Sequence, residues 1–226
     1  MSFFSAYKKF FIVFGIVSMG IMYLFYNALK PKASLPIYQP TMVDTQLVDS
    51  TVQHVKKYHQ IADFKLLNQN GQTITEEDYK DKIYIADFFF TTCPSICPIM
   101  TEHMVEIQKA IIDDPKVLLL SHSVTPEIDS VPVLKQYALK KGVVDSKWNL
   151  VTGDKKQIYE LARKSYLVAK DDGDGGPFDM IHTENFVLVD SKKRIRGFYD
   201  GTDPKDIEKL LEDLKILKAL EAKPSQ

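Results

Sequence analysis

The hydrophobic and polar positions of this chain fall into three patterns, and the first is a continuous apolar run near the N-terminus. Residues 10–29 read FFIVFGIVSMGIMYLFYNAL and contain no charged side chain. At about 1.5 Å per helical residue, this run can cross the roughly 30 Å of hydrocarbon in a bilayer. The pattern predicts one transmembrane anchor over 10–29, preceded by a cytoplasmic tail over 1–9. A cleaved signal peptide is the alternative, although its apolar core is usually shorter and no small-x-small pattern follows this run.

The orientation of this helix rests on its short N-terminal tail. Lys8 and Lys9 precede the apolar run, while Lys30 and Lys32 follow it, so the difference in charge is small. Because the tail offers little to translocate except two lysines, we expect the N-terminus inside the cell. The prediction is a single-pass protein of the inner cell membrane with its folded domain on the extracytoplasmic side. Thiols in that compartment face oxidising conditions.

The second pattern, over residues 30–58, lacks a sustained period of apolar positions. It contains Pro31, Pro36 and Pro40 within a mixed composition. Proline-containing stretches without apolar periodicity are typical of linkers. We therefore predict a tether over 30–58 and a folded domain over 59–222.

The third pattern alternates strand-like and helix-like segments through the rest of the chain. Short apolar or alternating runs predict strands at residues 61–67, 72–74, 82–90, 117–120, 148–151, 185–190 and 195–199. Helical spacing of apolar residues predicts helices at residues 98–112, 131–141, 155–166 and from 202 onward. Asn-Gly chemistry at 68–71 joins the first two strands as a hairpin. This order indicates an α/β fold with a central sheet, helices on both faces and an N-terminal hairpin.

Composition and charge exclude two classes of function. The 226 residues carry a formal net charge of −1, which gives no electrostatic reason to expect a nucleic-acid partner. Two cysteines are too few for a disulfide-stapled secreted fold, so any disulfide is local.

Those two cysteines, Cys93 and Cys97, lie where the strand-like run 82–90 gives way to a helix-like run. A helix start offers unpaired N–H groups and a partial positive charge, both of which favour a thiolate. Pro98 suits a first helical turn, where its missing N–H is not needed. Four-residue spacing allows the pair either to close a disulfide or to hold one soft metal ion. Two unrelated buried cysteines are the remaining interpretation.

Histidine is the natural further ligand, and the chain has five. His182 is the best candidate because it lies between a glycine-rich stretch and a strand, although a structural role is the alternative. His122 ends a buried strand on the expected cysteine side, His103 lies more than one helical turn beyond Cys97, and His54 and His59 are expected to be solvated.

Two other segments carry competing interpretations. Met100 and Met104 could supply thioether ligands, but their helical spacing with aliphatic residues favours core packing. The run KDDGDGGP at 170–177 suggests calcium, yet it lacks the closing glutamate of a calcium loop, so we expect a solvated mobile loop.

The stretch FFFTTCPSICPIMTEHM at 88–104, together with WNLVTG at 148–153 and the pair His182-Thr183, resembles the Sco/SenC family. Members are membrane-anchored, thioredoxin-like proteins that assist assembly of the copper centre of cytochrome c oxidase. The resemblance implies the same fold here, with Cys93, Cys97 and His182 as ligands of one copper ion. One departure is Thr125, where the family often has aspartate.

The resemblance and the donor chemistry together predict a copper metallochaperone rather than an enzyme with turnover. Thiolates favour Cu(I), and imidazole accepts Cu(I) or Cu(II). The implied partners are the copper-site subunit of the oxidase, an upstream copper donor and a thiol reductant. The alternative is a thiol-disulfide oxidoreductase with Cys93 and Cys97 as its redox-active pair, acting on the cysteines of that subunit. A peroxidase of the same fold is a third hypothesis.

Overall fold

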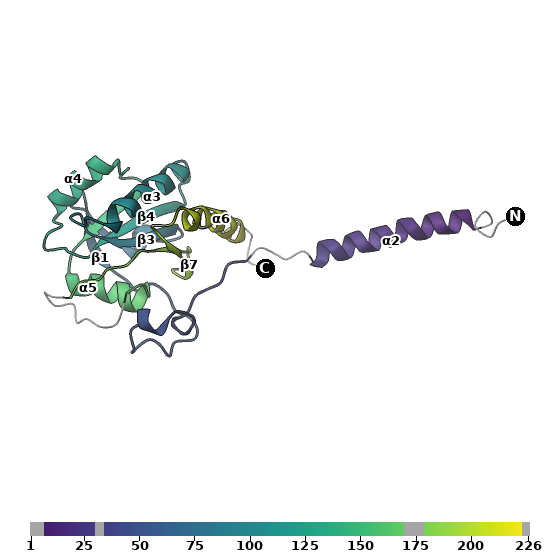
Figure 1. The fold of residues 1–226 in the computed structure, drawn as a ribbon, viewed down its shortest axis with the longest axis horizontal. Helices are drawn as coiled ribbons and strands as arrows, with labels where there is room; N and C mark the ends of the chain where they lie inside the picture. The colour runs from purple at the N-terminus through teal and green to yellow at the C-terminus, as the bar shows by residue number, and fades with distance from the viewer. Residues whose placement is uncertain (1–6, 30–33, 170–178, 223–226) are drawn as a thin grey trace. The chain divides into compact units, whose positions relative to one another are not determined.

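The computed structural model describes residues 7–29, 34–169 and 179–222 and divides the chain into two compact units, Met1–Ser34 and Leu35–Gln226 (Figure 1). The first unit contains helix α2, Lys8–Leu29, which includes the predicted span. Its residues are almost all exposed, and it is long and apolar enough to cross a membrane. A signal sequence near an N-terminus has the same length and composition.

The second unit is built on a seven-stranded sheet in the order β2-β1-β5-β4-β3-β6-β7. The strands β3, β4 and β5 are parallel, while β1–β2, β1–β5, β3–β6 and β6–β7 pair antiparallel. Their bounds are Lys65–Asn68, Thr73–Thr75, Ile83–Phe89, Val117–Ser123, Trp148–Thr152, Asn185–Val189 and Ile195–Asp200 for β1 to β7. Gly71, at a φ of 72°, provides the left-handed residue of the β1–β2 turn. Both predicted hairpins are therefore confirmed.

Helices cover both faces of this sheet (Figure 1). On one face lie α3, Ile96–Ala110, α4, Val131–Lys141, and α6, Pro204–Glu221, and on the other lies α5, Lys155–Glu160, which continues as a π-helical turn, Leu161–Ser165. Short 3-10 turns span Pro40–Met42, Thr45–Leu47 and Glu76–Tyr79. The arrangement confirms the predicted α/β fold with a helix-covered sheet.

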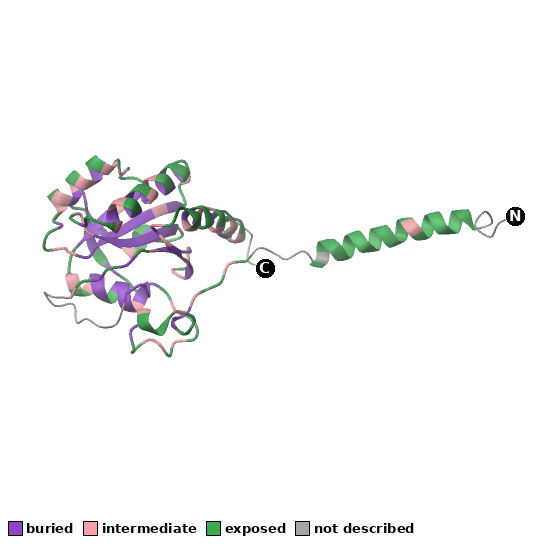
Figure 2. Ribbon diagram, in the orientation of Figure 1, coloured by how far each residue is buried: buried purple, intermediate pink, exposed green. Residues whose placement is uncertain are grey.

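Strand β3 is buried along its whole length, and in β4 every residue except the partly buried Leu118 is buried (Figure 2). Alternate residues of β3 enter different cores: Ile85 and Phe89 pack under α3, whereas Ala86 and Phe88 pack under α5. Burial on both faces explains why β3 and β4 read as continuous apolar runs. Strand β4 is three residues longer than the predicted 117–120, because Ser121, His122 and Ser123 pair with β3 despite their polarity.

The predicted tether over 30–58 is too long. Arg196 donates hydrogen bonds to the carbonyls of Leu35 and Pro36 at 2.8 Å, and Tyr38 N–H bonds to Ile195. Val48 is fully buried in the α5-side core. The side chains through which this segment packs on the domain are irregularly spaced, and some lie in short 3-10 turns. The sequence therefore has no apolar period that predicts the packing. The compact unit begins at Leu35 rather than at residue 59.

Candidate functional site

Strand β3, a six-residue loop and helix α3 position the two thiols. Cys93 lies in the loop, with its N–H bonded to the carbonyl of Phe90 at 3.3 Å, and Cys97 lies in the first turn of α3. The helix starts at Ile96, two residues earlier than predicted, so Pro98 still falls within the first turn. Both cysteines are buried and free, not bridged. The structure therefore brings together the two sulfur atoms of the predicted site.

The two thiols differ in acidity. Burial acts to raise the pKa of Cys93, but hydrogen bonds from the Cys97 thiol and from the N–H groups of Ser95 and Cys97 bring it down to about 7. Burial raises the pKa of Cys97 to about 12, and the hydrogen bond that it donates to Cys93 acts in the same direction. Cys93 is therefore the thiol that ionises near neutral pH, and thiolates are the reactive and metal-binding form.

A buried carboxylate holds the cysteine loop in place. Asp129, with no exposed surface, accepts hydrogen bonds from Thr91 N–H at 3.2 Å and from the hydroxyls of Thr91 at 2.5 Å, Ser123 at 2.5 Å and Thr125 at 3.1 Å. These donors come from the cysteine loop, from the end of β4 and from the loop that follows it. Asp129 thus ties together the three segments around the thiols. Thr125, the departure noted in the sequence, is one of its donors.

A second carboxyl group, Asp87, lies in β3 on the α3 side. Asp87 is 3 % exposed, and this burial raises its pKa to about 7, against a hydrogen bond from Ser121 that lowers it. Ser121 in turn accepts a hydrogen bond from the indole of Trp148 at 2.8 Å. The charge of Asp87 also acts to raise the pKa of Cys97. Sequence reasoning missed this residue, although a carboxyl group inside an otherwise apolar strand was a signal that could have found it.

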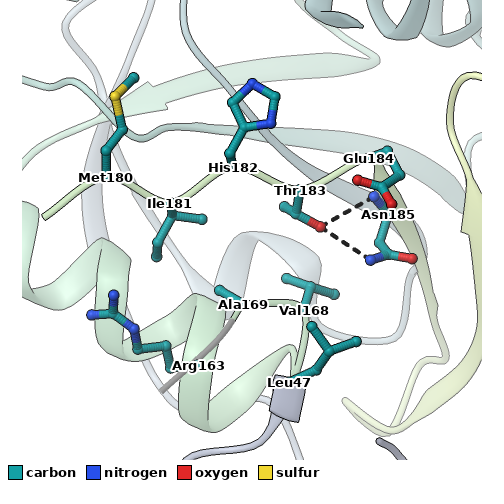
Figure 3. A pocket seen from close by; sticks show the side chains of 10 residues that line it. All are labelled: Leu47, Arg163, Val168, Ala169, Met180, Ile181, His182, Thr183, Glu184 and Asn185. Carbon is teal, nitrogen blue, oxygen red and sulfur yellow. Dashed lines mark hydrogen bonds between the residues drawn. The ribbon is translucent and has the colours of Figure 1, made fainter. Parts of the chain in front are cut away.

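His182 lies in an extended segment just before β6 and is exposed (Figure 3). Its ring meets the ring of Phe90 edge-on, with 6.2 Å between centroids, and Phe90 is the first residue of the cysteine loop. The imidazole also lines a cavity of about 370 Å³. His182 therefore lies next to the loop that carries Cys93. Within residues 7–29, 34–169 and 179–222, however, no three potential ligands lie close enough together to bind one metal ion. Cys93, Cys97 and His182 are therefore neighbours, but their donor atoms do not converge on one position.

An ion pair fixes the start of the His182 segment. Arg163, in the π-helical turn, makes two hydrogen bonds of 2.7 Å to the carboxylate of Asp179, and both side chains are 7 % exposed. The hydroxyl of Tyr159 bonds to the carbonyls of Asp179 and Val124. Sequence reasoning missed this contact because residues sixteen apart in different segments give no periodic signal. The segment 170–177, for which a solvated mobile loop was predicted over a calcium site, lies outside the described residues.

The other histidines lie away from the thiols. His122 lies at the C-terminal end of β4, which runs parallel to β3 as expected, but its side chain is fully buried on the α5 side of the sheet, stacked on Phe88 at 4.7 Å. The alternation of β4 explains this, since Ser121 and Ser123 take the cysteine side. Burial lowers the pKa of His122 to about 4. His103 bonds to the carbonyl of Gly201 at 2.7 Å.

The two N-terminal histidines differ in environment. His54 is exposed, as predicted. His59 is half-buried, with its ring 2.7 Å from the carbonyl of Ser165, so the expectation of a solvated side chain is wrong there. Neither residue belongs to the site around the thiols.

Met100 and Met104 have no exposed surface and pack under the sheet with Ile107. Core packing is therefore confirmed over the thioether-ligand interpretation. Two thiols of unequal acidity and a neighbouring exposed imidazole remain as the donor set. Such a set suits a soft metal ion, since thiolate and imidazole together favour copper over hard cations.

The comparisons with known proteins agree with this geometry. The SCO1/SenC family model matches residues 52–219. A SCO1 protein homolog of Bacillus subtilis is 31% identical over 166 residues, which cover 72% of this chain and 84% of that protein.

Two solved structures extend the comparison. The structure of BsSco, a member of the Sco family of cytochrome c oxidase assembly proteins in which a disulfide switch was identified, is 30% identical with a TM-score of 0.60, covering 72% of this chain and 95% of that one. The structure of Bradyrhizobium japonicum ScoI with copper bound is 26% identical with a TM-score of 0.56, covering 71% and 99%. The predicted thioredoxin-like arrangement is confirmed by these neighbours. With a family match over most of its length, this chain belongs to the SCO1/SenC family.

Proposed function

We propose that this protein is a membrane-anchored copper chaperone that delivers copper to the binuclear copper site of cytochrome c oxidase. The observation that carries the proposal is the pair of free, unequal thiols next to an exposed imidazole. The relatives support it, because BsSco belongs to a family of cytochrome c oxidase assembly proteins and ScoI of Bradyrhizobium japonicum binds copper. The oxidase subunit that carries the copper site is the proposed recipient.

In this proposal Cys93, Cys97 and His182 each supply one ligand to the bound copper ion. Cys93 provides the first sulfur ligand, because its thiol ionises near neutral pH. Cys97 provides the second and releases its proton as the ion binds, so copper uptake is coupled to proton release. His182, carried by the segment next to Phe90, provides the imidazole. An exposed third ligand favours release of the ion to a partner as well as its capture.

Helix α2 supplies the anchor in this proposal. Its length and apolar surface suit a membrane span, and we place the domain on the extracytoplasmic side. An anchor limits the search for the recipient to the membrane surface, because tethering raises the effective concentration of a neighbouring membrane protein.

The proposal is tested by His182→Ala, with His54→Ala as the matched control because His54 is also exposed but lies outside the site. Loss of the imidazole is expected to weaken Cu(I) affinity by at least roughly tenfold, measured by competition with a chromophoric chelator. The thiols of the variant are expected to cycle normally with a dithiol reductant. Equal copper affinity in the two variants would contradict the role of His182.

A thiol-disulfide oxidoreductase is the second candidate, favoured by the acidity difference between the thiols. An ionised Cys93 suits attack on a partner's disulfide, and Cys97 beside it can then give up its proton and attack the mixed disulfide, which releases the partner in its reduced form. The same experiment separates the candidates. If His182→Ala loses copper affinity but supports oxidase assembly fully, the protein acts on the recipient's cysteines and not as a copper donor.

A further inference from the structure

Met180 is an unusual methionine in this fold. Met100 and Met104 are fully buried, as an apolar side chain normally is, whereas Met180 is 51 % exposed. Met42 is the other exposed methionine in the part of Leu35–Gln226 that the structure describes, and it lines a different cavity. About half of Met180 is therefore accessible from solvent.

The position of Met180 relates it to His182. The two side chains leave the same side of the extended segment, while Ile181 points to the opposite side, where it is buried (Figure 3). Residues two apart in an extended chain are separated by roughly 6.6 Å along the segment and share a face. A thioether and an imidazole so placed can reach one ion between them.

Met180 also borders the cysteine loop. It lines the cavity of about 370 Å³ that includes His182 and a second cavity of about 420 Å³ that includes Phe90 and Thr92. Thr92 directly precedes Cys93. Met180 therefore borders both the cavity at His182 and the cavity at the loop that carries Cys93.

The backbone around Met180 is fixed on both sides. Asp179 is held by the ion pair with Arg163 and by the hydroxyl of Tyr159, and Ile181 is 4 % exposed. The thioether is thus presented to solvent by a structured segment. A preorganised pair of ligands loses less conformational entropy when a metal ion binds.

We propose that Met180 and His182 form an uptake site for Cu(I), from which the ion passes to Cys93 and Cys97; this inference rests on the proposed chaperone function. A thioether is a soft, neutral ligand that selects Cu(I) and binds without releasing a proton. In the transfer, the bond from copper to Met180 breaks and bonds to the two sulfurs of the cysteines form. The thiol protons go to water, and copper stays in the +1 state throughout.

The test uses the full chain in detergent with both thiols replaced, Cys93→Ser together with Cys97→Ser. This chain is expected to bind one Cu(I), measured by competition with bicinchoninate. Adding Met180→Leu is expected to weaken that binding by roughly tenfold or more. Adding Met42→Leu instead serves as the matched control and is expected to change nothing. Leucine conserves volume, so unchanged thermal unfolding would show that both variants fold.

A spectroscopic measurement makes the assignment specific. In the selenomethionine-labelled chain with the serine replacements and Cu(I) bound, absorption at the selenium edge is expected to show a copper neighbour that disappears in Met180→Leu but not in Met42→Leu. Equal Cu(I) affinity for the two leucine variants, with no selenium–copper contact, would overturn the uptake site while the chain with its cysteines still bound copper. Failure of the unaltered chain to bind Cu(I) would instead overturn the chaperone function.

Discussion

Cys93 and Cys97 are chemically unequal although only three residues separate them. The pKa of Cys93 is about 7 because hydrogen bonds from Ser95 and Cys97 favour its thiolate against the effect of burial, whereas burial raises that of Cys97 to about 12. The inequality sets an order of events, since the ionised sulfur bonds first and the second proton leaves only as the ion or disulfide forms. Copper binding and thiol exchange both begin at Cys93 and both require the proton of Cys97 to leave second. The two cysteines and their spacing are therefore compatible with either function.

Asp87 is expected to destabilise the domain as pH rises. Its folded-state pKa of about 7 lies above the ordinary value of 3.8, so the folded state holds the proton more tightly than the unfolded state. The free energy of unfolding should therefore fall as pH rises from about 4 to about 7. Asp87→Asn removes this penalty and should be more stable than the parent at pH 8, by up to about 4 kcal/mol. Urea unfolding at pH 4 and pH 8 measures the difference.

Two comparisons sharpen this experiment. Asp113→Asn removes an exposed carboxylate near the end of α3 and is expected to leave the pH profile unchanged. His122 acts in the opposite sense, because its pKa is lowered to about 4 and stability is lost as pH falls from 6.5 toward 4. The two slopes offset one another in the parent chain. A profile for Asp87→Asn that matches the parent would show that Asp87 is ionised in the folded protein.

At the scale of elements, the cysteine loop depends on Asp129 for its position. Thr91, two residues before Cys93, donates two hydrogen bonds to this carboxylate, and Ser123 holds the same carboxylate from β4. The loop therefore cannot shift without breaking contacts to a neighbouring strand. This arrangement preorganises the thiols for a metal ion.

Asp129→Asn is expected to loosen the loop, because an amide nitrogen would face donors that now meet an acceptor. The free energy of unfolding should fall by about 1–3 kcal/mol, and Cu(I) affinity should fall with it. Glu127→Gln is the matched control, since Glu127 lies on the same loop, is exposed and forms only a 3.9 Å ion pair with Lys155. Amide hydrogen exchange of the cysteine loop measures the loosening. Equal rates of amide hydrogen exchange in the two variants would show that Asp129 does not position the cysteine loop.

The elements show which features a sequence can predict. Strand β3 and helix α3 were predicted because burial leaves continuous apolar runs and helical spacing, and the position of Cys93 and Cys97 between them followed. Asp129 left no such signal, because Thr91 is thirty-eight residues away in sequence. The face of the sheet that His122 takes could not be predicted, because β4 continues through polar residues and each further residue of strand reverses the face of the side chain.

At the scale of the whole molecule, the segment 35–58 belongs to the folded unit. The family match begins at residue 52, yet Val48 is fully buried and Tyr38 packs edge-on against Phe198 at 5.1 Å. Arg196, which bonds to Leu35 and Pro36, is itself paired with the buried carboxylate of Asp190 at 3.1 Å. The segment 35–58 is therefore part of the domain and not of the predicted tether.

A pair of shortened chains tests this assignment. The chain starting at Leu35 keeps the docked segment, whereas a chain starting at Val52 loses the burial of Val48 and leaves the guanidinium of Arg196 without two acceptors. We expect the shorter chain to be less stable by about 2–4 kcal/mol in urea unfolding, since it loses one buried aliphatic side chain and several hydrogen bonds. Arg196→Lys in the longer chain should reproduce part of this loss, because an ammonium lacks the planar fork that reaches two carbonyls and Asp190 together. Equal unfolding midpoints for the two chains would show that the segment 35–58 adds nothing to the stability of the domain, as expected of a free tether.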